Sequence, residues 1–356
     1  MRRPPAAARD GRLRLERFSS ALDVEPEEPS VVAVVIPTYK ARPTIERVVR
    51  RALAVADVVV VVDDADPDRS AELVRGIDPR VHVVGHEVNR GVGGATKTGM
   101  REAIALGAQY IVKIDSDDQM DTSYVPFMIE TLERYPEVDL VKGNRFADPA
   151  TLRRMPFLRL IGNASATLLV KFSSGYWSIV DPTNGFLATR REVILNTDLD
   201  ALADRYFFET DLLCAFGLRR RVVAEVEMPA IYSDEPPGPW GLRTLLPFPI
   251  KLTQRFFRRL LLNYLIVEIN VGSLCGLIGL PLLAFAILFG WHEWSGSLAE
   301  QTSRPSGTIV LALLLFMIGF QLSLIALLYD VGFSTPTIKL RRERADRAAV
   351  RAPARR

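Results

Sequence analysis

Two carboxylates stand two positions apart, directly after a short apolar run of the chain. The run covers residues 110–114, and Asp115 and Asp117 follow it. Carboxylates at this spacing at a strand end can both reach one hard cation, and Mg²⁺ or Mn²⁺ prefers carboxylate oxygen together with phosphate oxygen. A cation held here would bridge a diphosphate and neutralise the charge on a departing nucleotide. A second interpretation is an acidic turn that caps a helix beginning after Thr122.

Two further polar segments follow apolar runs. The pair Asp63-Asp64 comes after residues 58–62, where a carboxylate could accept a hydrogen bond from a base N–H or cap the segment that follows. Residues 89–95, Asn-Arg-Gly-Val-Gly-Gly-Ala, open a predicted helix, and glycines at a helix N-terminus let backbone N–H groups approach phosphate. A dinucleotide fingerprint would have glycine where Thr96 stands, and a P-loop would have it there too, so the segment is neither.

The elements that must position these side chains alternate along the chain. Short β-branched runs at 31–36, 58–62, 81–84 and 110–114 alternate with segments of helical spacing at 44–55, 69–76 and 95–106. This alternation indicates βαβ units with a buried parallel sheet, which binds ligands at the carboxyl ends of its strands. We therefore predict an α/β fold with a Rossmann-like, mostly parallel sheet over residues 30–240.

Two long apolar segments follow this region. Residues 269–290 and 309–329 contain no charged residue. Each would span roughly 30 Å as a helix, about one bilayer core. We expect a two-helix transmembrane hairpin over 269–330, because charge-free runs of this length are rare in soluble folds. Residues 241–268 mix basic residues with Leu, Phe and Pro, which is typical of an amphipathic interfacial segment.

Charge and composition narrow the class of protein. The hydrophobic content of 48% excludes a disordered chain, and two cysteines exclude a disulfide framework or a four-cysteine zinc site. The net charge is +3, yet residues 339–356 hold eight basic and two acidic residues. A basic tail behind an apolar segment is not a nucleic-acid footprint, so we expect a lipid bilayer as partner and no nucleic acid.

The same charges predict an orientation. Basic residues precede the first apolar segment and follow the second, whereas the connection 292–308 has only Arg304. The positive-inside rule then places the large domain and both termini in the cytosol, in a protein integral to the cytoplasmic membrane. Residues 1–29 are expected to form a flexible tail without a signal peptide, and residues 331–356 a basic cytosolic tail. The two-helix anchors could pack with a second copy to form a homo-oligomer.

Seven segments match one known family in order and spacing. They are 35–39 (Val-Ile-Pro-Thr-Tyr), 62–64 (Val-Asp-Asp), 89–93 (Asn-Arg-Gly-Val-Gly), 115–119 (Asp-Ser-Asp-Asp-Gln), 143–145 (Gly-Asn-Arg), 184–186 (Asn-Gly-Phe) and 208–209 (Phe-Glu). Together they resemble the GT-A fold of family 2 glycosyltransferases, and within it the membrane-anchored polyprenyl-phosphate sugar synthases similar to dolichol-phosphate mannose synthase. The resemblance covers about residues 31–231. It implies metal-dependent transfer of a sugar from a nucleotide diphosphate sugar to a polyprenyl monophosphate, with Mg²⁺ or Mn²⁺ as cofactor.

The resemblance also implies roles for individual residues. The nucleotide base and ribose would be held by Pro37, Tyr39, Val62 and Asp64, and the metal, diphosphate and sugar by Asp115, Ser116, Asp117 and Gln119. Asp115 and Asp117 would be the metal ligands, and Asp117 counts among the catalytic residues. Arg145 matches the arginine that meets the acceptor phosphate, and Glu209 matches the acidic position of the acceptor-side motif.

The chain departs from the mannose-type synthases at two places. Lys40-Ala41 stands where those enzymes usually have Asn-Glu, and residues 232–240 hold neither the Arg nor the Lys of their late loop. The donor is therefore left open between UDP-linked and GDP-linked sugars.

The chemistry of the acceptor predicts the mechanism. A polyprenyl monophosphate is already anionic at pH 7, so it can attack without the base that a sugar hydroxyl needs. It needs a cation that holds it in line, a role suited to Arg145, with Arg159 or Lys171 as weaker candidates. We therefore expect direct displacement at the anomeric carbon with inversion. Glu209 or Asp211 would orient the acceptor-side pocket.

Two alternatives stay open. A GT-A enzyme could act on a different lipid or glycan acceptor, and Glu209 or Asp211 would then become the base. The chain could instead be a catalytically silent, membrane-anchored scaffold that binds nucleotide sugars, although such a scaffold has no need to keep Asp115 and Asp117. Metal-dependent hydrolysis of the donor would separate the scaffold from an enzyme.

Overall fold

The computed structural model describes residues 30–146, 157–229, 231, 247–332 and 337–342. The expectations for the N-terminal tail, for the late loop at 232–240 and for most of the basic C-terminal tail fall outside these ranges.

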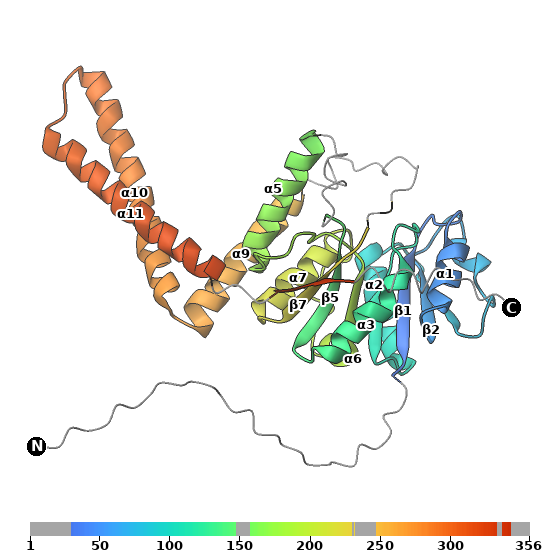
Figure 1. The fold of residues 1–356 in the computed structure, drawn as a ribbon. Coiled ribbons are helices and arrows are strands. Elements are labelled where there is room, and N and C mark those ends of the chain that lie inside the picture. The colour runs from blue at the N-terminus through green and yellow to red at the C-terminus, as the bar shows by residue number, and fades with distance from the viewer. Residues whose placement is uncertain (1–29, 147–156, 230, 232–246, 333–336, 343–356) are drawn as a thin grey trace, which may run out of the picture. The chain divides into compact units, whose positions relative to one another are not determined.

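An eight-stranded sheet forms the centre of the described chain (Figure 1). Its strands are β1 (Val32–Thr38), β2 (Val58–Asp63), β3 (Val81–Gly85), β4 (Tyr110–Lys113), β5 (Val138–Asn144), β6 (Leu187–Arg190), β7 (Val222–Glu227) and β8 (Thr337–Arg341). Their order is β3-β2-β1-β4-β6-β5-β7-β8. Strand β6 is antiparallel to both neighbours, and every other adjacent pair is parallel. The predicted mostly parallel α/β sheet is therefore confirmed.

Helices cover both faces of this sheet. They are α1 (Ile45–Leu53), α2 (Val92–Ala105), α3 (Val125–Arg134), α5 (Phe157–Ser174), α6 (Arg191–Leu195) and α7 (Phe208–Leu218), with short 3-10 turns η1 (Ser70–Leu73) and η2 (Thr122–Tyr124). Alternate residues of β1 face two cores: Val34 and Ile36 pack with α1 and α3, and Ala33 and Val35 pack with α2 and α7. A strand buried on both faces needs apolar residues throughout, which explains the continuous apolar runs of the sequence.

The strand register brings the candidate site residues to one edge. Thr38 pairs with Asp63 and Val35 pairs with Lys113, so the segments that follow β1, β2 and β4 all leave the sheet at its carboxyl edge. This is the edge at which open α/β sheets bind ligands.

The predicted helix at 69–76 is wrong. The structure forms only the single turn η1 there, between Arg69 at φ +52° and Gly76 at φ +79°. The carboxylate of Asp66 accepts hydrogen bonds from the N–H groups of Asp68 and Ser70 and from the Ser70 hydroxyl, which fixes a tight turn instead of a helix.

Two long apolar helices follow the α/β region, after α9 (Pro247–Leu261) and the π-helical turn η3 (Leu262–Val267). They are α10 (Val271–Glu300) and α11 (Ser306–Gly332), and each is long and apolar enough to cross a membrane. A Cβ atom added at Gly319 would lie 2.6 Å from the backbone N of Leu283, so this glycine lets the two helices approach closely. Helix α10 extends ten residues past the predicted end of the first span, 290 to 300.

The last strand, β8, was not foreseen in the sequence. It lies inside the stretch expected to be a basic tail, and it pairs in parallel with β7 through Ala224↔Ile338 and Val226↔Leu340. Ile338 and Leu340 pack against the core, whereas the alternate residues Thr337, Lys339 and Arg341 are polar. The chain therefore returns to the edge of the sheet after the apolar hairpin.

Candidate functional site

A buried lysine joins two carboxylates at the carboxyl edge of the sheet. Lys113, the last residue of β4, is fully buried, and its Nζ lies 2.5 Å from Asp115 Oδ1 and 2.9 Å from Glu209 Oε1. Glu209 belongs to the first turn of α7. Burial lowers the pKa of Lys113, but the charges of Asp115 and Glu209 outweigh it and raise the pKa above its usual value. The lysine therefore stays charged and ties the segment after β4 to α7.

Asp115 and Asp117 form an acidic pair open to solvent. The Asp115 side chain is 32% exposed, and Asp117 is exposed. The protein packed around the Asp117 carboxyl and the nearby charge of Asp115 both raise the pKa of Asp117. Two carboxylates that repel each other in this way are relieved by a shared cation, and Mg²⁺ is often held by one or two carboxylates plus substrate phosphates. The residues therefore fit the expected metal.

No larger ligand set surrounds this pair. Within the ranges that the structure describes, no group of three or more His, Cys, Asp or Glu side chains is arranged to hold a metal ion. A cation at Asp115 and Asp117 would therefore need oxygen ligands from the substrate.

Gly185 lies directly against the buried charges. A Cβ atom added there would lie 2.4 Å from Lys113 Nζ and 2.9 Å from Asp115 Oδ2. Any larger residue would displace these side chains, so the Asn-Gly-Phe segment at 184–186 forms part of the wall of the site.

The loop after Asp115 is held by α1 and its N-cap. Thr44 donates a hydrogen bond to the carbonyl of Ser116, at 2.5 Å. Asp118, in a left-handed conformation at φ +61°, pairs with Arg47 at 2.5 Å and with Arg51 at 2.7 Å. The Asp118 carboxylate is thus paired with α1, so Asp115 and Asp117 are the carboxylates of this loop that could bind a cation. The helix-capping interpretation applies to another residue, because Asp121 accepts the N–H of Ser123 at the start of η2.

The predicted nucleotide-binding residues occupy the ends of β1 and β2. Pro37 and Val62 are buried within these strands, and Tyr39, just past β1, is 46% exposed. Asp64 is buried, and its carboxylate lies 2.8 Å from His86 Nδ1 and accepts the N–H groups of residues 90 and 91. Asp64 thus anchors the glycine-rich turn before α2, and Tyr39 is the member of the set that faces solvent.

Arg145, the predicted acceptor-binding residue, is oriented by an aspartate. Its guanidinium lies 2.8 and 3.1 Å from the two carboxylate oxygens of the fully buried Asp181, and its side chain is 37% exposed. The backbone N–H of Asp181 donates to Glu225 on β7, at 3.1 Å. The side chain of Arg159 lies outside the described atoms, and Lys171 is half-buried, with its pKa lowered by burial.

A buried lysine beneath Arg145 was missed by the sequence analysis. Lys142 on β5 is fully buried and donates a hydrogen bond to the carbonyl of Asn184. Burial lowers the pKa of Lys142 to about 8, although the charge of Asp181 opposes this shift. The sequence did not indicate that Lys142, Asp181 and Glu225 lie together, because they come from segments far apart in the chain. Lys142 and Asp181 could have been suspected only from their positions close to the recognised motifs at 143–145 and 184–186.

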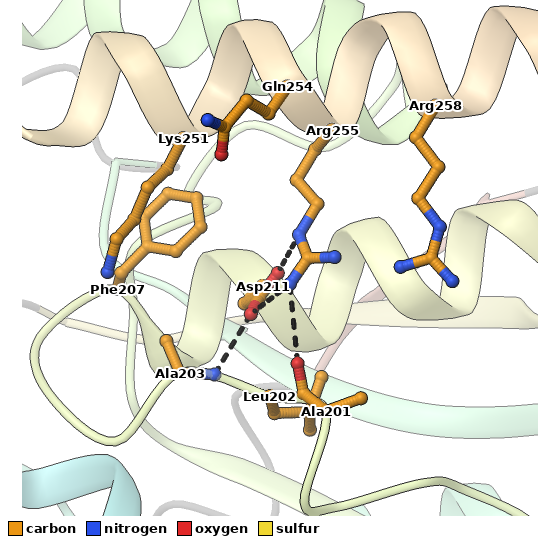
Figure 2. Close-up of a pocket in the computed structure, with 9 residues that line it drawn as sticks. All are labelled: Ala201, Leu202, Ala203, Phe207, Asp211, Lys251, Gln254, Arg255 and Arg258. Atoms are coloured by element: carbon orange, nitrogen blue, oxygen red, sulfur yellow. Dashed lines mark hydrogen bonds and ion pairs between the residues drawn. The ribbon is translucent and has the colours of Figure 1, made fainter.

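Asp211 points away from the acidic pair. Its side chain is 2% exposed, and its carboxylate pairs with Arg255 on α9, with Oδ1 2.6 Å from Nε and Oδ2 2.8 Å from Nη2 (Figure 2). It also accepts the backbone N–H of Ala203 at 2.9 Å. The structure therefore brings Glu209 to Asp115 through Lys113, and turns Asp211 to the other side of α7.

Comparisons with known proteins place this site in a family. Residues 33–198 match the family described as Glycosyl transferase family 2. The chain is 31% identical to the polyprenol monophosphomannose synthase of Mycolicibacterium smegmatis over 225 aligned residues. The alignment covers 60% of this chain and 83% of that protein. The chain belongs to glycosyltransferase family 2. The expected enzyme class is thereby confirmed, and so is the GT-A type of α/β fold.

This family 2 glycosyltransferase is also similar to a second curated protein and to a solved structure. It is 24% identical over 220 residues to the UDP-N-acetylglucosamine–dolichyl-phosphate N-acetylglucosaminyltransferase of Methanococcus voltae, covering 57% of this chain and 87% of that one. A solved glucosyl-3-phosphoglycerate synthase from Mycobacterium tuberculosis, in complex with Mn²⁺, UDP-glucose and phosphoglyceric acid, is 21% identical, with a TM-score of 0.49, over 65% of this chain and 80% of that one. The family match at 33–198 contains Asp64, Asp115, Asp117 and Arg145, and Glu209 lies beyond it.

Proposed function

We propose that this glycosyltransferase moves a sugar from a nucleotide diphosphate sugar to a polyprenyl monophosphate, with inversion, at the cytosolic face of the membrane. The names of the two curated relatives both pair a sugar with a polyprenol or dolichyl phosphate, which supports this acceptor class. One names mannose and the other UDP-N-acetylglucosamine, so the proposal leaves the sugar open.

The main support for the proposal is that both carboxylates that could act as a base, Glu209 and Asp211, are held in ion pairs. Glu209 is held by the ammonium of Lys113, and Asp211 by the guanidinium of Arg255. A sugar hydroxyl as acceptor would need one of these carboxylates to take its proton. A phosphate acceptor needs no base, since it is already an anion. The site therefore favours the phosphate over the alternative glycan acceptor.

Asp115 and Asp117 would hold Mg²⁺ or Mn²⁺ together with the donor diphosphate. When bound, the cation offsets the charge that develops on the leaving nucleoside diphosphate. Lys113 keeps Asp115 in place and Glu209 beside it. On the donor side, the exposed ring of Tyr39 would stack on the base, next to the buried Pro37 and Val62, while Asp64 shapes the turn at residues 89–91. Ser116 and Gln119 would line the diphosphate and sugar.

Arg145 would hold the acceptor phosphate, because a guanidinium binds phosphate in a fork and Asp181 fixes its plane. An oxygen of the acceptor phosphate attacks the anomeric carbon as the bond from that carbon to the nucleotide oxygen breaks. The new bond forms on the face opposite the leaving group, so the configuration inverts. The nucleoside diphosphate leaves with the electron pair of the broken bond.

Helices α10 and α11 would anchor this reaction at the bilayer. A Cβ atom added at Gly272 would lie 2.6 Å from the ring of Tyr329, so the start of α10 and the end of α11 lie together. The described chain before and after the hairpin therefore attaches at one end of it. The distribution of basic residues makes this end the cytosolic one.

The test uses purified full-length protein in detergent with Mn²⁺ or Mg²⁺, a panel of UDP- and GDP-sugars and a polyprenyl phosphate. We expect a sugar–phosphate lipid whose formation falls at least about a hundredfold in Asp117→Asn and is unchanged in Glu133→Gln, an exposed carboxylate on α3. Nucleotide release without glycolipid would overturn the acceptor assignment. A folded protein that turns over no donor in the panel would overturn the whole proposal.

A further inference from the structure

A basic pocket lies between α9 and the loop that precedes α7. It has a volume of about 290 Å³, and its polar lining includes Asp211, Lys251, Arg255 and Arg258 (Figure 2). We propose that this pocket binds the phosphate of an anionic membrane lipid other than the sugar acceptor. The proposal goes beyond the reaction described above and uses residues different from those at Arg145.

The charges of the pocket do not balance. Asp211 is paired with Arg255, whose Nη2 also donates to the carbonyl of Ala201 at 3.3 Å. Within the described part of the chain, neither Lys251 nor Arg258 forms an ion pair with a carboxylate, and the ammonium of Lys251 lies 5.4 Å from the centre of the Phe207 ring. Figure 2 shows both side chains reaching from α9 toward α7. Two positive charges therefore remain for an anion.

Arg255 is well placed as the third contact. Its side chain is 24% exposed, and Asp211 fixes its position from the buried side. A guanidinium held in this way is preorganised for an anion, because its side chain does not have to be ordered on binding.

The position of the pocket on α9 favours a lipid over a soluble anion. Ile250 and Phe257 are seven residues apart on one stripe of the helix, and each is 61% exposed. Lys251 and Arg258 are also seven apart, so they form a second stripe directly beside it. Leu252 and Arg259 are buried on the protein side. A helix with apolar and basic stripes side by side places its cations at the level of lipid phosphates when its apolar stripe enters the bilayer.

The phosphate would then sit between Lys251, Arg255 and Arg258, with its acyl chains beside Ile250 and Phe257. Arg255 pairs with Asp211 of α7, which also carries Glu209, so the bound lipid would be linked through this ion pair to the helix that bears Glu209. The ligand class that fits is a phosphodiester headgroup of negative net charge, such as phosphatidylglycerol. Phosphatidylcholine has the same phosphate but adds a positive charge next to the cations.

The proposal is tested on the full chain in a neutral detergent by native mass spectrometry. Phosphatidylglycerol and phosphatidylcholine of equal chain length are added separately, and the retained lipid is counted. We expect preferential retention of phosphatidylglycerol by the wild-type protein. The double variant Lys251→Gln/Arg258→Gln should retain about thirtyfold less of it, since each basic residue near a membrane surface contributes on the order of 1 kcal/mol and two are removed.

The matched control removes two exposed charges elsewhere, in Arg75→Gln/Arg134→Gln, and should retain as much lipid as the wild type. A single variant, Arg258→Gln, covers the case in which the double variant does not fold, and should show an intermediate loss. Equal retention of phosphatidylglycerol by the wild type and the Lys251→Gln/Arg258→Gln variant would overturn the proposal. Displacement of both lipids by millimolar inorganic phosphate, without a preference for phosphatidylglycerol, would identify a general anion site and overturn the lipid assignment. Sugar transfer is measured in parallel, so failure of the enzyme assay is seen separately.

Discussion

Lys113 shows how one buried side chain can organise a catalytic edge. Its ammonium pairs with both Asp115 and Glu209, and Asp117 is the more exposed carboxylate of the acidic pair. Glu209 is 11% exposed, and Lys113 supplies the ion-pair partner that a buried carboxylate needs.

Replacing the lysine therefore tests the arrangement. We expect Lys113→Met to lower the free energy of unfolding by about 3 kcal/mol and to abolish activity, because two carboxylates lose their shared cation. The double variant Lys113→Met/Glu209→Gln should recover part of the stability but no activity. Urea unfolding of the detergent-solubilised protein measures the stability of both variants, and the sugar-transfer assay measures their activity. A single variant as stable as the wild type would contradict the role given to Lys113.

Lys142 predicts a dependence of stability on pH. Its pKa is about 8 in the folded protein, below its ordinary 10.5, so between these pH values the unfolded chain binds more protons than the folded chain. Folding stability should therefore rise as the pH increases from 8 toward 10.5, by about 2 kcal/mol at pH 10. Two groups with raised pKa values act in the opposite direction. Burial raises the pKa of Cys214 to about 12, so its contribution lowers stability above about pH 9, and the raised pKa of Lys113 does the same above about pH 10.5.

The measurement compares the wild type with Lys142→Met from pH 8 to 10, using the melting temperature in detergent. Cys214 titrates alike in both proteins, so the wild type should gain melting temperature relative to the variant as the pH rises from 8 to 10. Parallel curves for the two proteins would show that Lys142 does not titrate in this range.

At the scale of elements, one ion cluster attaches the end of α11 to the catalytic domain. Asp330 lies 2.6 and 2.9 Å from the guanidinium nitrogens of Arg259 on α9, and accepts hydrogen bonds from Tyr264 and Trp177 at 2.5 and 3.0 Å. Arg259 also donates to the carbonyl of Phe172 on α5. Four separate segments therefore meet at one carboxylate, near the end of the hairpin.

Breaking the buried ion pair of this cluster should lower the melting temperature more than breaking an exposed ion pair elsewhere. Asp330→Asn should lower the melting temperature by several degrees, because it leaves the buried Arg259 without its counter-charge. The pair of Arg220 with Glu268, at 3.5 Å, has both side chains more than half exposed, so Glu268→Gln should change the melting temperature little. Equal effects of the two substitutions would contradict the anchoring role of Asp330.

The elements also show which parts of the fold could be predicted. The β-branched runs of β1, β2 and β4 are buried on both faces, so their composition alone identified them, and Asp115 and Asp117 could be located from the strand before them. Strand β8 was missed because Thr-Ile-Lys-Leu-Arg is short and half polar, and its pairing partner β7 lies more than a hundred residues earlier. The pairing of Asp211 with Arg255 was missed for the same reason, since neither residue signals its partner locally.

At the scale of the whole molecule, the proposed membrane orientation of the α10–α11 hairpin can be tested directly. Ser303 lies in the connection between α10 and α11, and Arg75 lies exposed in the α/β region. With the proposed orientation, a membrane-impermeant maleimide should label Ser303→Cys in intact cells and should label Arg75→Cys only after lysis. The wild-type protein is the background control, because Cys214 is buried and Cys275 is partly buried within α10. Labelling of Arg75→Cys in intact cells would reverse the proposed orientation.

Strand β8 also has a consequence for the order of synthesis. The ribosome makes the hairpin before it makes residues 337–341, yet these residues complete the edge of the catalytic sheet beside β7. Until they emerge, β7 presents an unpaired edge that could recruit strands from other chains. Completion of the catalytic sheet must therefore wait until the hairpin has been translated, and a nascent chain arrested before β8 would carry an aggregation-prone edge.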